Sequence, residues 1–491
     1  MIYIHWLGVF IYALVVIAVI VRVLMDRLQP AKTMAWLLVL TFLPVVGIVL
    51  YFFFGQNTRK ERIITQKSLD QLTKRSMLEF VEQRNLILPE EHKVVINLFI
   101  NQSAALPFKD NSIDIYTNGY EFFPALLAAI SQAKSHIHLV SYIFEDDPLG
   151  NVVADALISK VREGVEVRVI YDDVGCWKVK NQFFERMREE GIEVHPFLPV
   201  RFPSFTSKVN YRNHRKICVI DGQIGFIGGM NIAMRYVKGR KGNSYWRDTH
   251  LKVQGSAVYG LQRAFLIDWY FADRTLISNR MYYPGVSGEF GNSEKNGDAT
   301  LTGTTNLCAG LMQIVTSNPT SPWPDIEQGY VRILLEAKRY VYLETPYFLP
   351  TEPILFAMRT AAIAGVDIRL MLPLHGDAKI VEWASRSYVM QTIEAGVKVY
   401  FYKPGFNHSK LLVSDDSIAS CGSANIDFRS FENNFEANVF IYDKSICLQI
   451  KEVFLVDQQQ CILLDDMTDL EHRPFVNRLW EAFVRLLSPL L

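Results

Sequence analysis

The chain has no excess of either charge. Its 491 residues contain 51 Lys and Arg against 51 Asp and Glu, and only 21% of the chain is charged. A neutral chain has no bulk attraction to the polyanionic backbone of nucleic acid, so we expect no nucleic-acid partner. The length is typical of two or three domains with substantial cores.

Cysteine is scarce and its pattern is uninformative. The six cysteines form no CxxC pair and no Cys/His cluster, which argues against a zinc site and against a disulfide framework. They are Cys176, Cys218, Cys308, Cys421, Cys447 and Cys461. We expect reduced thiols, some of them in cores.

Charge is absent altogether from two long stretches near the N-terminus. Residues 2–21 and 34–54 contain no Lys, Arg, Asp or Glu, and each stretch is close to the ~20 residues that a helix needs to cross a bilayer. The charged segment RVLMDRLQPAKT separates them. A cleaved signal peptide would need a basic start and a small-residue cleavage site, and a buried soluble hairpin is the other alternative. The pattern predicts a transmembrane helical hairpin over residues 1–56.

The side of the membrane is indicated only by basic residues. Three of them lie in the hairpin loop (Arg22, Arg27, Lys32), and six follow the second stretch (Arg59, Lys60, Arg62, Lys67, Lys74, Arg75). The excess after the second stretch favours a cytoplasmic location for the rest of the chain. The first stretch alone favours the opposite, because no Lys or Arg precedes it.

Helix and strand patterns alternate from residue 112 onward, and the order occurs twice. The first series has helices at 121–136, 151–164 and 183–191 and strands at 137–145, 165–175 and 192–197. The second has helices at 330–339, 354–365 and 387–396 and strands at 340–348, 366–373 and 397–402. Even the junctions match, as in AKSHIHLV and AKRYVYLE. We therefore expect a duplicated α/β domain.

The boundaries of the two copies follow from composition. We expect a juxtamembrane segment at 57–111, a first domain at 112–277 and a second domain at 306–470. The segment 278–305 between them is rich in Gly, Ser, Asn and Thr, as a linker is. Two similar domains commonly pack about a pseudo-twofold axis, which would bring equivalent loops into one site.

The most informative feature is a pattern of polar residues, here called the frame, that occurs twice. The two copies are NHRKICVIDGQIGFIGGMNI (213–232) and NHSKLLVSDDSIASCGSANI (407–426). The frames share a histidine, a lysine two positions on, an aspartate five beyond that, a glycine, and Asn-Ile. The matched positions are His214 and His408, Lys216 and Lys410, Asp221 and Asp415, and Asn231 and Asn425. The other eight histidines lack any such frame, so we regard them as structural.

Two imidazoles that face one another suit a double displacement. One can attack a phosphorus or carbonyl centre, while the other protonates the leaving oxygen and then activates the acceptor. The lysines and asparagines of the frames would stabilise anionic oxygens. No group of carboxylates with metal-ligand spacing accompanies the frames, so we expect no metal. Asp221 and Asp415 each begin a turn, and capping that turn is at least as well supported as direct chemistry.

The paired HxKxxxxD motifs, each followed by GG or GS and an asparagine, resemble the phospholipase D superfamily. Within it, the N-terminal AWLLVLTFLPVVGIVLYFFFG and the C-terminal VRLLSPLL resemble the membrane-bound cardiolipin synthases of bacteria. The resemblance covers essentially the whole chain. It implies two phospholipase D-type α/β sandwich domains, related by duplication, in an enzyme anchored in the bacterial inner membrane. It also implies transfer between two phosphatidylglycerol molecules to give cardiolipin and glycerol, through a phosphatidyl-histidine and without a cofactor.

The resemblance also implies roles for individual residues. His214 matches the usual nucleophile and His408 the general acid and base, although the near symmetry of the frames would let them exchange. Lys216, Lys410, Asn231 and Asn425, with Gly229 and Ser423, would lie at the phosphate. Asp248 would orient His408, and Glu436 would orient His214, each through the other ring nitrogen.

Two further segments have open interpretations. Residues 471–491 place apolar side chains along one helical face (Phe475, Leu479, Trp480, Phe483, Leu487), which predicts an amphipathic interfacial helix or a helix docked on the domain. The basic string of Arg212, Arg215 and Lys216 is either a solvated turn or a patch for anionic headgroups.

Alternative functions remain at this stage. Water could replace the alcohol at the same site, giving a phospholipid or nucleic-acid hydrolase, and another phosphatidyltransferase activity fits as well. A non-catalytic membrane scaffold is the third class, and the two complete frames argue against it. The sequence leaves self-association open.

Overall fold

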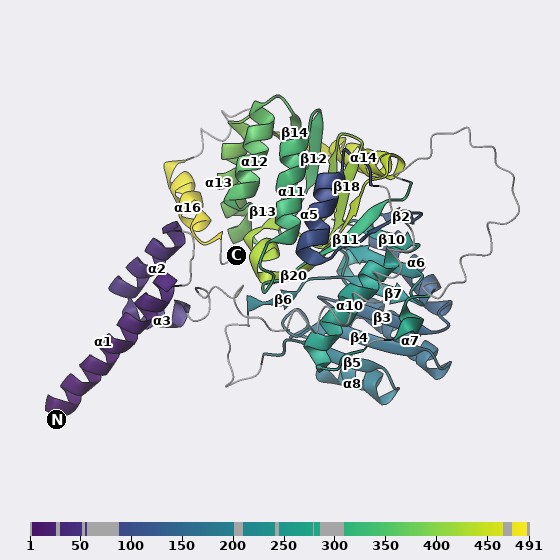
Figure 1. Cartoon of the computed structure of the whole chain (residues 1–491), viewed down its shortest axis with the longest axis horizontal. Coiled ribbons are helices and arrows are strands. Elements are labelled where there is room, and N and C mark those ends of the chain that lie inside the picture. Colours follow the sequence, from purple (N-terminus) through teal and green to yellow (C-terminus); the bar gives the residue numbers. More distant parts are fainter. Residues whose placement is uncertain are drawn as a thin grey trace, which may run out of the picture.

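The structure is a computed structural model that describes residues 2–25, 30–51, 55, 88–200, 210–240, 245–277, 279–284, 309–464 and 474–488. Two α/β halves lie against each other, and the N-terminal helices project to one side (Figure 1). We refer to the two α/β halves as the first half and the second half, in chain order.

The first half is built on a seven-stranded sheet. Its strands, in spatial order, are β2 (Ser112–Tyr116), β10 (His250–Gln254), β8 (Ile224–Gly228), β7 (Ile217–Ile220), β3 (His136–Ser141), β4 (Glu166–Asp172) and β5 (Glu193–Phe197). β3, β4 and β5 are parallel. Every residue of β3 is buried, as expected for a strand covered on both faces.

Three helices cover one face of this sheet: α6 (Gly119–Ser131), α7 (Pro148–Arg162) and α8 (Asn181–Glu189). The first two begin at capping residues. The Asn118 side chain accepts a hydrogen bond from the Glu121 N–H, and Asp147 accepts one from the Gly150 N–H. Such caps satisfy backbone donors that the helix leaves open.

The second half repeats the strand order. Its strands are β11 (Met312–Ser317), β20 (Asn434–Ile441), β18 (Ile418–Gly422), β17 (Leu411–Ser414), β12 (Tyr340–Glu344), β14 (Asp367–Pro373) and β15 (Lys398–Tyr402). Its covering helices are α11 (Asp325–Glu336), α12 (Glu352–Ile363) and α13 (Lys379–Ile393). The predicted duplication is confirmed. The helix ends are shifted, most of all in α13, which begins eight residues before the predicted 387.

The second sheet is extended at both edges. β1 (Pro107–Phe108) pairs with β11, and β21 (Cys461–Leu463) pairs with β15. α5 (Lys93–Ser103) packs on this half, where the ring of Phe99 lies 4.4 Å from that of Phe440. The end of the segment 57–111, which we expected to be juxtamembrane, is therefore part of the second half's core.

A shared core lies between the two sheets. α10 (Val258–Asp273) and α14 (Lys444–Gln458) contribute buried side chains to one cluster that also contains residues of both sheets. Trp269 of α10 and Phe454 of α14 are both fully buried within it. Because one core spans both halves, loops from each are held in fixed positions relative to the other.

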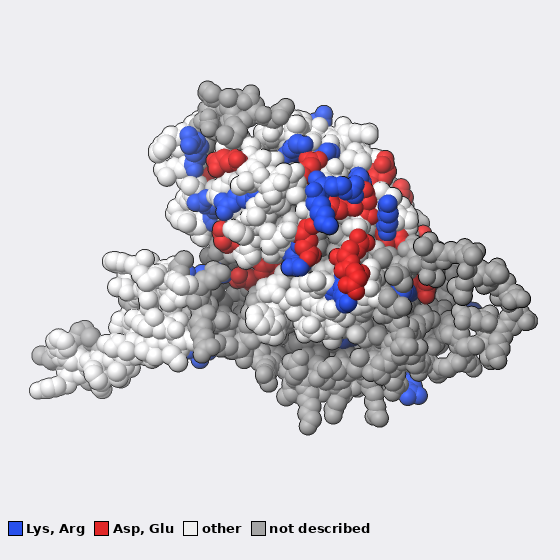
Figure 2. All heavy atoms as spheres, turned by 45° about the horizontal axis from the view of Figure 1, so that its top comes forward, with Lys and Arg blue, Asp and Glu red and all other residues white. Residues whose placement is uncertain are grey.

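The N-terminal region forms α1 (Ile2–Met25), α2 (Pro30–Phe42) and α3 (Pro44–Leu50). Many of its apolar side chains are exposed, among them Phe10, Ile17, Leu38 and Phe42, and its visible surface is almost uncharged (Figure 2). Across the described residues, no helix combines the length and the apolar character needed to cross a membrane. The transmembrane hairpin is thus not confirmed and stays a prediction.

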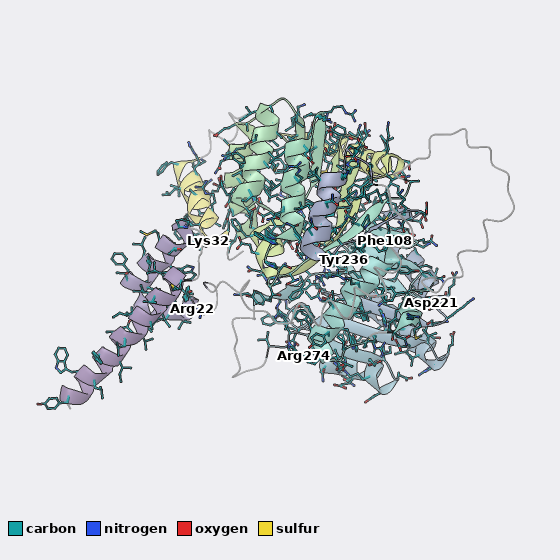
Figure 3. The ribbon with its side chains drawn as sticks, viewed as in Figure 1. Arg22, Lys32, Phe108, Asp221, Tyr236 and Arg274 are labelled. Atoms are coloured by element: carbon teal, nitrogen blue, oxygen red, sulfur yellow. The ribbon has the colours of Figure 1, made fainter. Side chains whose placement is uncertain are left out.

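One ion pair joins this region to the second half. Lys32 Nζ lies 3.0 Å from Glu432 Oε2 and 5.6 Å from the centre of the Phe428 ring. Lys32 accordingly faces the α/β halves, and Arg22 lies near the inner end of α1, away from the N-terminus (Figure 3).

The C-terminal helix α16 (Phe475–Arg485) lies on α13. Val484 is buried there, and the ring of Trp480 lies 6.0 Å from that of Trp383. Phe475, Leu479 and Phe483 are more than half exposed. The helix is therefore docked on the domain and also presents an apolar face to its surroundings.

Several predictions concern residues outside those described. The linker at 278–305 is described only at 279–284, which include the 3₁₀ helix η4 (Arg280–Tyr282). Arg27 and the six basic residues between Arg59 and Arg75, on which the orientation depends, are outside the described ranges. The five described cysteines are free, and all but Cys461 are buried.

The packing of α5 gives a stability prediction. Phe99→Ala should destabilise the fold by about 3–5 kcal/mol, because it empties the buried space against Phe440. Val94 lies on the same helix and is 54% exposed, so Val94→Ala should cost less than about 0.5 kcal/mol. Chemical denaturation of both variants would measure the difference, and equal losses would contradict the burial of α5.

Candidate active site

Each histidine of the repeated frame follows a short strand that pairs with the other half. His214 follows β6 (Arg212–Asn213), which pairs with β20. His408 follows β16 (Phe406–Asn407), which pairs with β9 (Trp246–Arg247). The His214 N–H donates to the Phe435 carbonyl at 2.9 Å, and the His408 N–H donates to the Arg247 carbonyl at 2.7 Å. The backbone of one half thus fixes the histidine of the other.

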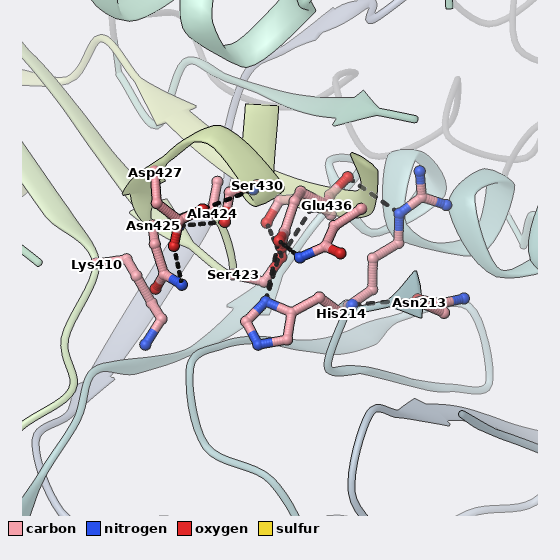
Figure 4. A network of polar contacts seen from close by, with 12 residues as sticks. Asn213, His214, Lys410, Ser423, Ala424, Asn425, Asp427, Ser430 and Glu436 are labelled. Atoms are coloured by element: carbon pink, nitrogen blue, oxygen red, sulfur yellow. Dashed lines mark hydrogen bonds and ion pairs between the residues drawn. The ribbon is translucent and has the colours of Figure 1, made fainter. Parts of the chain in front are cut away.

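Side-chain contacts also join the two halves across the boundary between them, which we call the seam. His214 Nδ1 lies 3.0 Å from Glu436 Oε1, and His408 Nδ1 lies 2.7 Å from Asp248 Oδ2. These are the two pairs that the family resemblance implies. Each carboxylate binds the ring through Nδ1, so Nε2 is the nitrogen that can react with a substrate. Figure 4 shows the contact of His214 with Glu436.

Both carboxylates are completely buried. Burial alone would raise their pKa values. The charge of Lys410 and the hydrogen bond from His408 outweigh this effect at Asp248, and the hydrogen bond from His214 and the charge of Lys216 do so at Glu436, so the pKa of each carboxyl lies below its usual range. Both groups are therefore anionic at neutral pH and can hold an imidazole Nδ1–H.

Burial has the opposite consequence for the basic groups. It lowers the pKa of Lys216 to about 7 and that of Lys410 to about 8. Burial, with the nearby Lys410 charge, lowers the pKa of His408 to about 3. Burial also lowers the pKa of His214, although Glu436 opposes it. In the free site both imidazoles are neutral and able to act as nucleophile or base, and a bound anion would raise all four pKa values.

The lysine ammonium groups lie beside the histidines. Lys216 Nζ donates to the His214 carbonyl and Lys410 Nζ to the His408 carbonyl. Lys410 Nζ also lies 2.9 Å from His408 Nδ1. Each histidine of the site thus has a buried lysine amine beside it.

The histidines line a cavity of about 550 Å³ between the halves. Its walls include aromatic and basic side chains, Asn231 and Asn425, and the carboxylates of Asp377 and Asp427. The aromatic residues are Tyr142, Tyr236, Trp246 and Tyr347, and the basic ones Arg212, Arg235, Arg240 and Arg429. The ring of Tyr142 lies 5.0 Å from that of His214, and the ring of Trp246 lies 5.5 Å from that of His408.

Sequence reasoning missed these aromatic walls. Tyr142 directly follows β3, and Tyr347 follows β12 by three residues. The carboxyl ends of neighbouring parallel strands are where sites in α/β folds usually lie, so the position of the two tyrosines was the available signal. Tyr347 lies with its ring 6.2 Å from that of His408.

The remaining residues expected at the phosphate have other contacts in this structure. Asn231 Oδ1 accepts from the Ile143 N–H at 3.0 Å, and its Nδ2 donates to the Tyr236 hydroxyl. Ser423 Oγ donates to Glu436. A Cβ at Gly229 would lie only 2.0 Å from Asp248 Oδ1, so glycine leaves room for that carboxylate.

Asp221 and Asp415 lie away from the cavity, at the far ends of β7 and β17. Asp221 accepts from the backbone N–H groups of residues 134–136, and Asp415 from those of residues 338–340. Figure 3 shows Asp221 at the edge of the first half, far from Tyr236. Both have a positive φ, and their contacts are those of a cap at the start of a strand.

The basic string is neither a solvated turn nor, at Arg215, a headgroup patch. Arg215 is 2% exposed, donates to Asp268 and also to the Glu436 carbonyl. Arg212 lies 3.5 Å from the buried Asp172. Both interpretations of Arg215 were wrong, because a buried carboxylate lies beneath it. Across the seam, Arg247 pairs with Asp457 at 2.7 Å, a contact that no sequence pattern indicated.

Among the residues that the structure describes, no group of three or more His, Cys, Asp or Glu side chains could hold a metal ion. The expected independence from metal stays a prediction that an assay must test.

Comparison with known families gives one consistent match. The family model described as the PLD-like domain of cardiolipin synthase matches residues 126–254 and 330–457. A second model, described as a phospholipase D-nuclease N-terminal region, matches residues 10–56. The first model therefore occurs once in each half and includes each frame.

Curated relatives match along nearly their entire length. A cardiolipin synthase of Listeria monocytogenes is 37% identical over 99% of this chain and 100% of its own. The major cardiolipin synthase of Bacillus subtilis is 38% identical over 99% of this chain and 98% of its own. Among solved structures, the phosphatidylserine synthase of Haemophilus influenzae has a TM-score of 0.62, with 16% identity, over 82% of this chain and 100% of its own. That likeness supports the fold alone.

The depressed lysine pKa values give a pH prediction. Lys216 and Lys410 lose their protons near pH 7 and 8, and a neutral amine does not attract an anion. Sulfate, which stays dianionic, should therefore bind about tenfold or more weakly at about pH 9 than at about pH 6. Calorimetric titration would measure this. Lys216→Met should bind sulfate weakly throughout with a flatter profile, and a pH-independent affinity in the unaltered chain would contradict the prediction.

Proposed function

This chain belongs to the family of cardiolipin synthases with PLD-like domains, and on that basis we propose that it joins two phosphatidylglycerol molecules into cardiolipin and releases glycerol. One observation carries the proposal. Two imidazoles, each with Nδ1 on a buried carboxylate of the opposite half, line one cavity together with its basic side chains. This arrangement suits a double displacement at phosphorus.

The first displacement transfers the phosphatidyl group to the enzyme. His214 Nε2 attacks the donor phosphorus, so that a P–N bond forms and the P–O bond to the glycerol headgroup breaks. His408, as an imidazolium, gives its Nε2 proton to the departing oxygen, and glycerol leaves. The near symmetry of the frames also permits the reverse assignment of the two histidines.

The second displacement returns the enzyme to its starting state. His408, now neutral, takes the proton from a glycerol hydroxyl of the second phosphatidylglycerol. That oxygen attacks phosphorus, the new P–O bond forms, and the P–N bond to His214 breaks. The products are cardiolipin and a free enzyme whose protons balance those of the start.

The surrounding charges make these steps feasible. Asp248 and Glu436 hold the Nδ1–H tautomers and stabilise each imidazolium as it forms. The donor phosphate brings a negative charge beside four buried basic groups and so raises their pKa values. His408 can then carry the proton that it lacks in the free site, and Lys216 and Lys410 stay charged against the phosphate oxygens.

The supporting residues act through their contacts. The amide of Asn231 is used by Ile143 and Tyr236, so we assign it to holding this wall of the cavity. Gly229 leaves room for the carboxylate of Asp248, and Ser423 donates a hydrogen bond to that of Glu436. Asp221 and Asp415 fix the strands from their far ends. The reciprocal strand and carboxylate contacts across the seam support a pseudo-twofold relation of the halves.

We also propose that the N-terminal helices anchor the enzyme as a hairpin in the bacterial cytoplasmic membrane, with the α/β halves on the cytoplasmic face. The uncharged runs 2–21 and 34–54 and the exposed apolar side chains of α1 and α2 support this. α16 lies on the same side of the molecule as α2 (Figure 1), and its exposed Phe475 and Phe483 suit an interfacial helix. Self-association stays an open prediction.

Reconstitution tests the reaction. The purified chain in phosphatidylglycerol vesicles with EDTA should form cardiolipin and glycerol in equal amounts, followed by mass spectrometry. His214→Ala and His408→Ala should each reduce turnover by about 10³-fold or more, because each removes a reacting group. Phosphatidic acid as the main product would instead indicate hydrolysis.

Conservative carboxylate variants refine this experiment. Asp248→Asn and Glu436→Gln keep the side-chain shape but remove the charge that holds each imidazole, so kcat should fall by about 10²- to 10⁴-fold with little change in KM. An unchanged kcat in both variants would mean that the crossed contacts are only structural.

Membrane location has its own test. After an alkaline carbonate wash the chain should remain with the membranes, because a hairpin anchor is held by apolar burial. Protease should cleave the α/β halves in inverted vesicles and leave them intact in spheroplasts. Release by carbonate would exclude the anchor, and cleavage in spheroplasts would reverse the orientation.

A further inference from the structure

A second short repeat lies behind the two histidines. The sequence FLID (265–268) is in α10 and FLVD (454–457) is in α14, so each half places one aspartate near the end of a helix of the shared core. Asp268 and Asp457 are 0% and 5% exposed. They follow the orienting carboxylates of their own halves by 20 and 21 residues. The two aspartates therefore occupy matched positions in the duplication.

Asp268 binds a buried arginine beside the first histidine. Arg215 directly follows His214 and donates to Asp268 through Nη1. Its Nε donates to the Glu436 carbonyl at 3.0 Å, and its Nη2 donates to the Ser317 carbonyl at 3.1 Å. One guanidinium thus connects the strand that carries the histidine, the strand that carries its orienting carboxylate, and helix α10.

Asp268 is an anion in this contact. Burial raises the pKa of its carboxyl, and the charge of Arg215 and the hydrogen bonds from Asn213 and Arg215 oppose that effect. Its Oδ1 accepts from Arg215, and its Oδ2 accepts from Asn213 Nδ2 at 2.9 Å. A neutral carboxyl group would turn one of these oxygens into a donor, so the contacts are those of a carboxylate.

Asp457 binds an arginine in the same way beside the second histidine. Arg247 Nε donates to Asp457 Oδ2 at 2.8 Å. Its Nη1 donates to Thr249 Oγ1 at 2.9 Å and to the Thr117 carbonyl at 3.4 Å. Thr249 Oγ1 lies 2.7 Å from the hydroxyl of Ser409, the residue after the histidine. This guanidinium also connects both strands of the pair with a core helix.

The two arginines reach matched places from opposite strands. On the histidine strand, Arg215 is matched by Ser409. On the carboxylate strand, Phe435 is matched by Arg247, because the carbonyl of each accepts the N–H of the histidine across the strand pair. Both guanidiniums also reach a carbonyl at the end of a neighbouring strand, β11 in one half and β2 in the other. The frame itself does not indicate this equivalence, since the arginines stand at unmatched sequence positions.

We propose that Asp268 and Asp457 are positioning residues, each of which holds, through one buried arginine, the strand pair that carries a histidine and its orienting carboxylate. The inference rests on the proposed double displacement. Each histidine and its carboxylate come from different halves, so their alignment depends on the register of the two strands across the seam. A guanidinium is a rigid planar fork and fixes that register. Its loss would misplace the reacting nitrogen, so the effect falls on kcat rather than on KM.

Replacing each ion pair as a whole tests this role. Arg215→Met/Asp268→Leu and Arg247→Met/Asp457→Leu leave no unpaired buried charge, and such replacements commonly preserve stability. The full-length variants are assayed with the share of phosphatidylglycerol in the vesicles varied, and their thermal unfolding is followed. For each variant, kcat should fall about 10- to 100-fold while KM changes less than about threefold.

A matched control removes an ion pair elsewhere in the second half. Arg369 and Asp367 lie at the start of β14, where Nη2 and Oδ2 are 2.6 Å apart and both side chains are partly buried. Arg369→Met/Asp367→Leu should leave kcat unaltered, because neither residue lines the cavity or contacts a histidine strand. A fall in the control equal to that of the site variants would overturn the inference.

Moving the arginine is the most specific test. Arg247→Phe should lower kcat about tenfold or more. Adding Ser409→Arg and Thr249→Ala gives the second strand pair the residues that the first has at these places, Arg215, Ala437 and Phe435. The guanidinium can then reach Asp457 from the histidine strand, so the triple variant should recover about tenfold in kcat over Arg247→Phe. A folded triple variant without recovery would contradict the matched placement.

The remaining outcomes also decide the question. An unaltered kcat in both pair replacements overturns the inference, because the pairs then serve stability alone. If the pair replacements do not fold, Arg215→Lys and Arg247→Lys decide, since each keeps the charge but loses the fork, and an unaltered kcat in both again overturns it. If the unaltered chain makes no cardiolipin, the proposed function fails. The ¹⁵N spectrum of histidine-labelled chain then decides, because each pair replacement should shift the ring resonances of one active-site histidine, and unshifted spectra overturn the inference.

Discussion

The crossed carboxylates at the seam are the constraint on which the site depends. Asp248 and Glu436 are fully buried anions, and a buried charge without a partner costs several kcal/mol. Each carboxylate contacts a histidine of the opposite half. The pairing of β6 with β20 and of β16 with β9, and the core formed around α10 and α14, keep those partners in register.

Much of the fold can be predicted from local sequence patterns, because helices and strands each place apolar residues at a characteristic spacing. The repeat of AKSHIHLV as AKRYVYLE was enough to predict that β3 and β12 are equivalent. The frames likewise predicted which histidines and lysines would lie at one site, and the family resemblance implied which carboxylates would orient the histidines. What the sequence could not show were contacts between residues without a shared pattern. Arg247 and Asp457 lie in different halves, and Arg215 is buried beside Asp268. The segment of α5 was predicted to be juxtamembrane, and only the contact of Phe99 with Phe440 shows that it belongs to the second half.

The same limit applies to the asparagines and aspartates of the frame. Sequence identity between Asn231 and Asn425 suggests identical tasks, yet their partners are set by nonlocal neighbours, Ile143 and Tyr236 in one case and Asp427 in the other. Asp221 and Asp415 stand seven residues from the histidines, and an intervening strand carries them to the opposite end of the sheet. Position in a motif therefore does not establish proximity to the reaction.

The exchange of contacts across the seam also bears on how far the two copies can differ. Each copy contains a histidine and a carboxylate that do not contact one another, so a site built from identical copies would need a homodimer. In one chain the two copies are always present together and need not be identical. Arg215 is matched by Ser409, and Gly229 by Ser423. The two copies can differ in this way because each has its own sequence within the chain, whereas the subunits of a homodimer share one sequence.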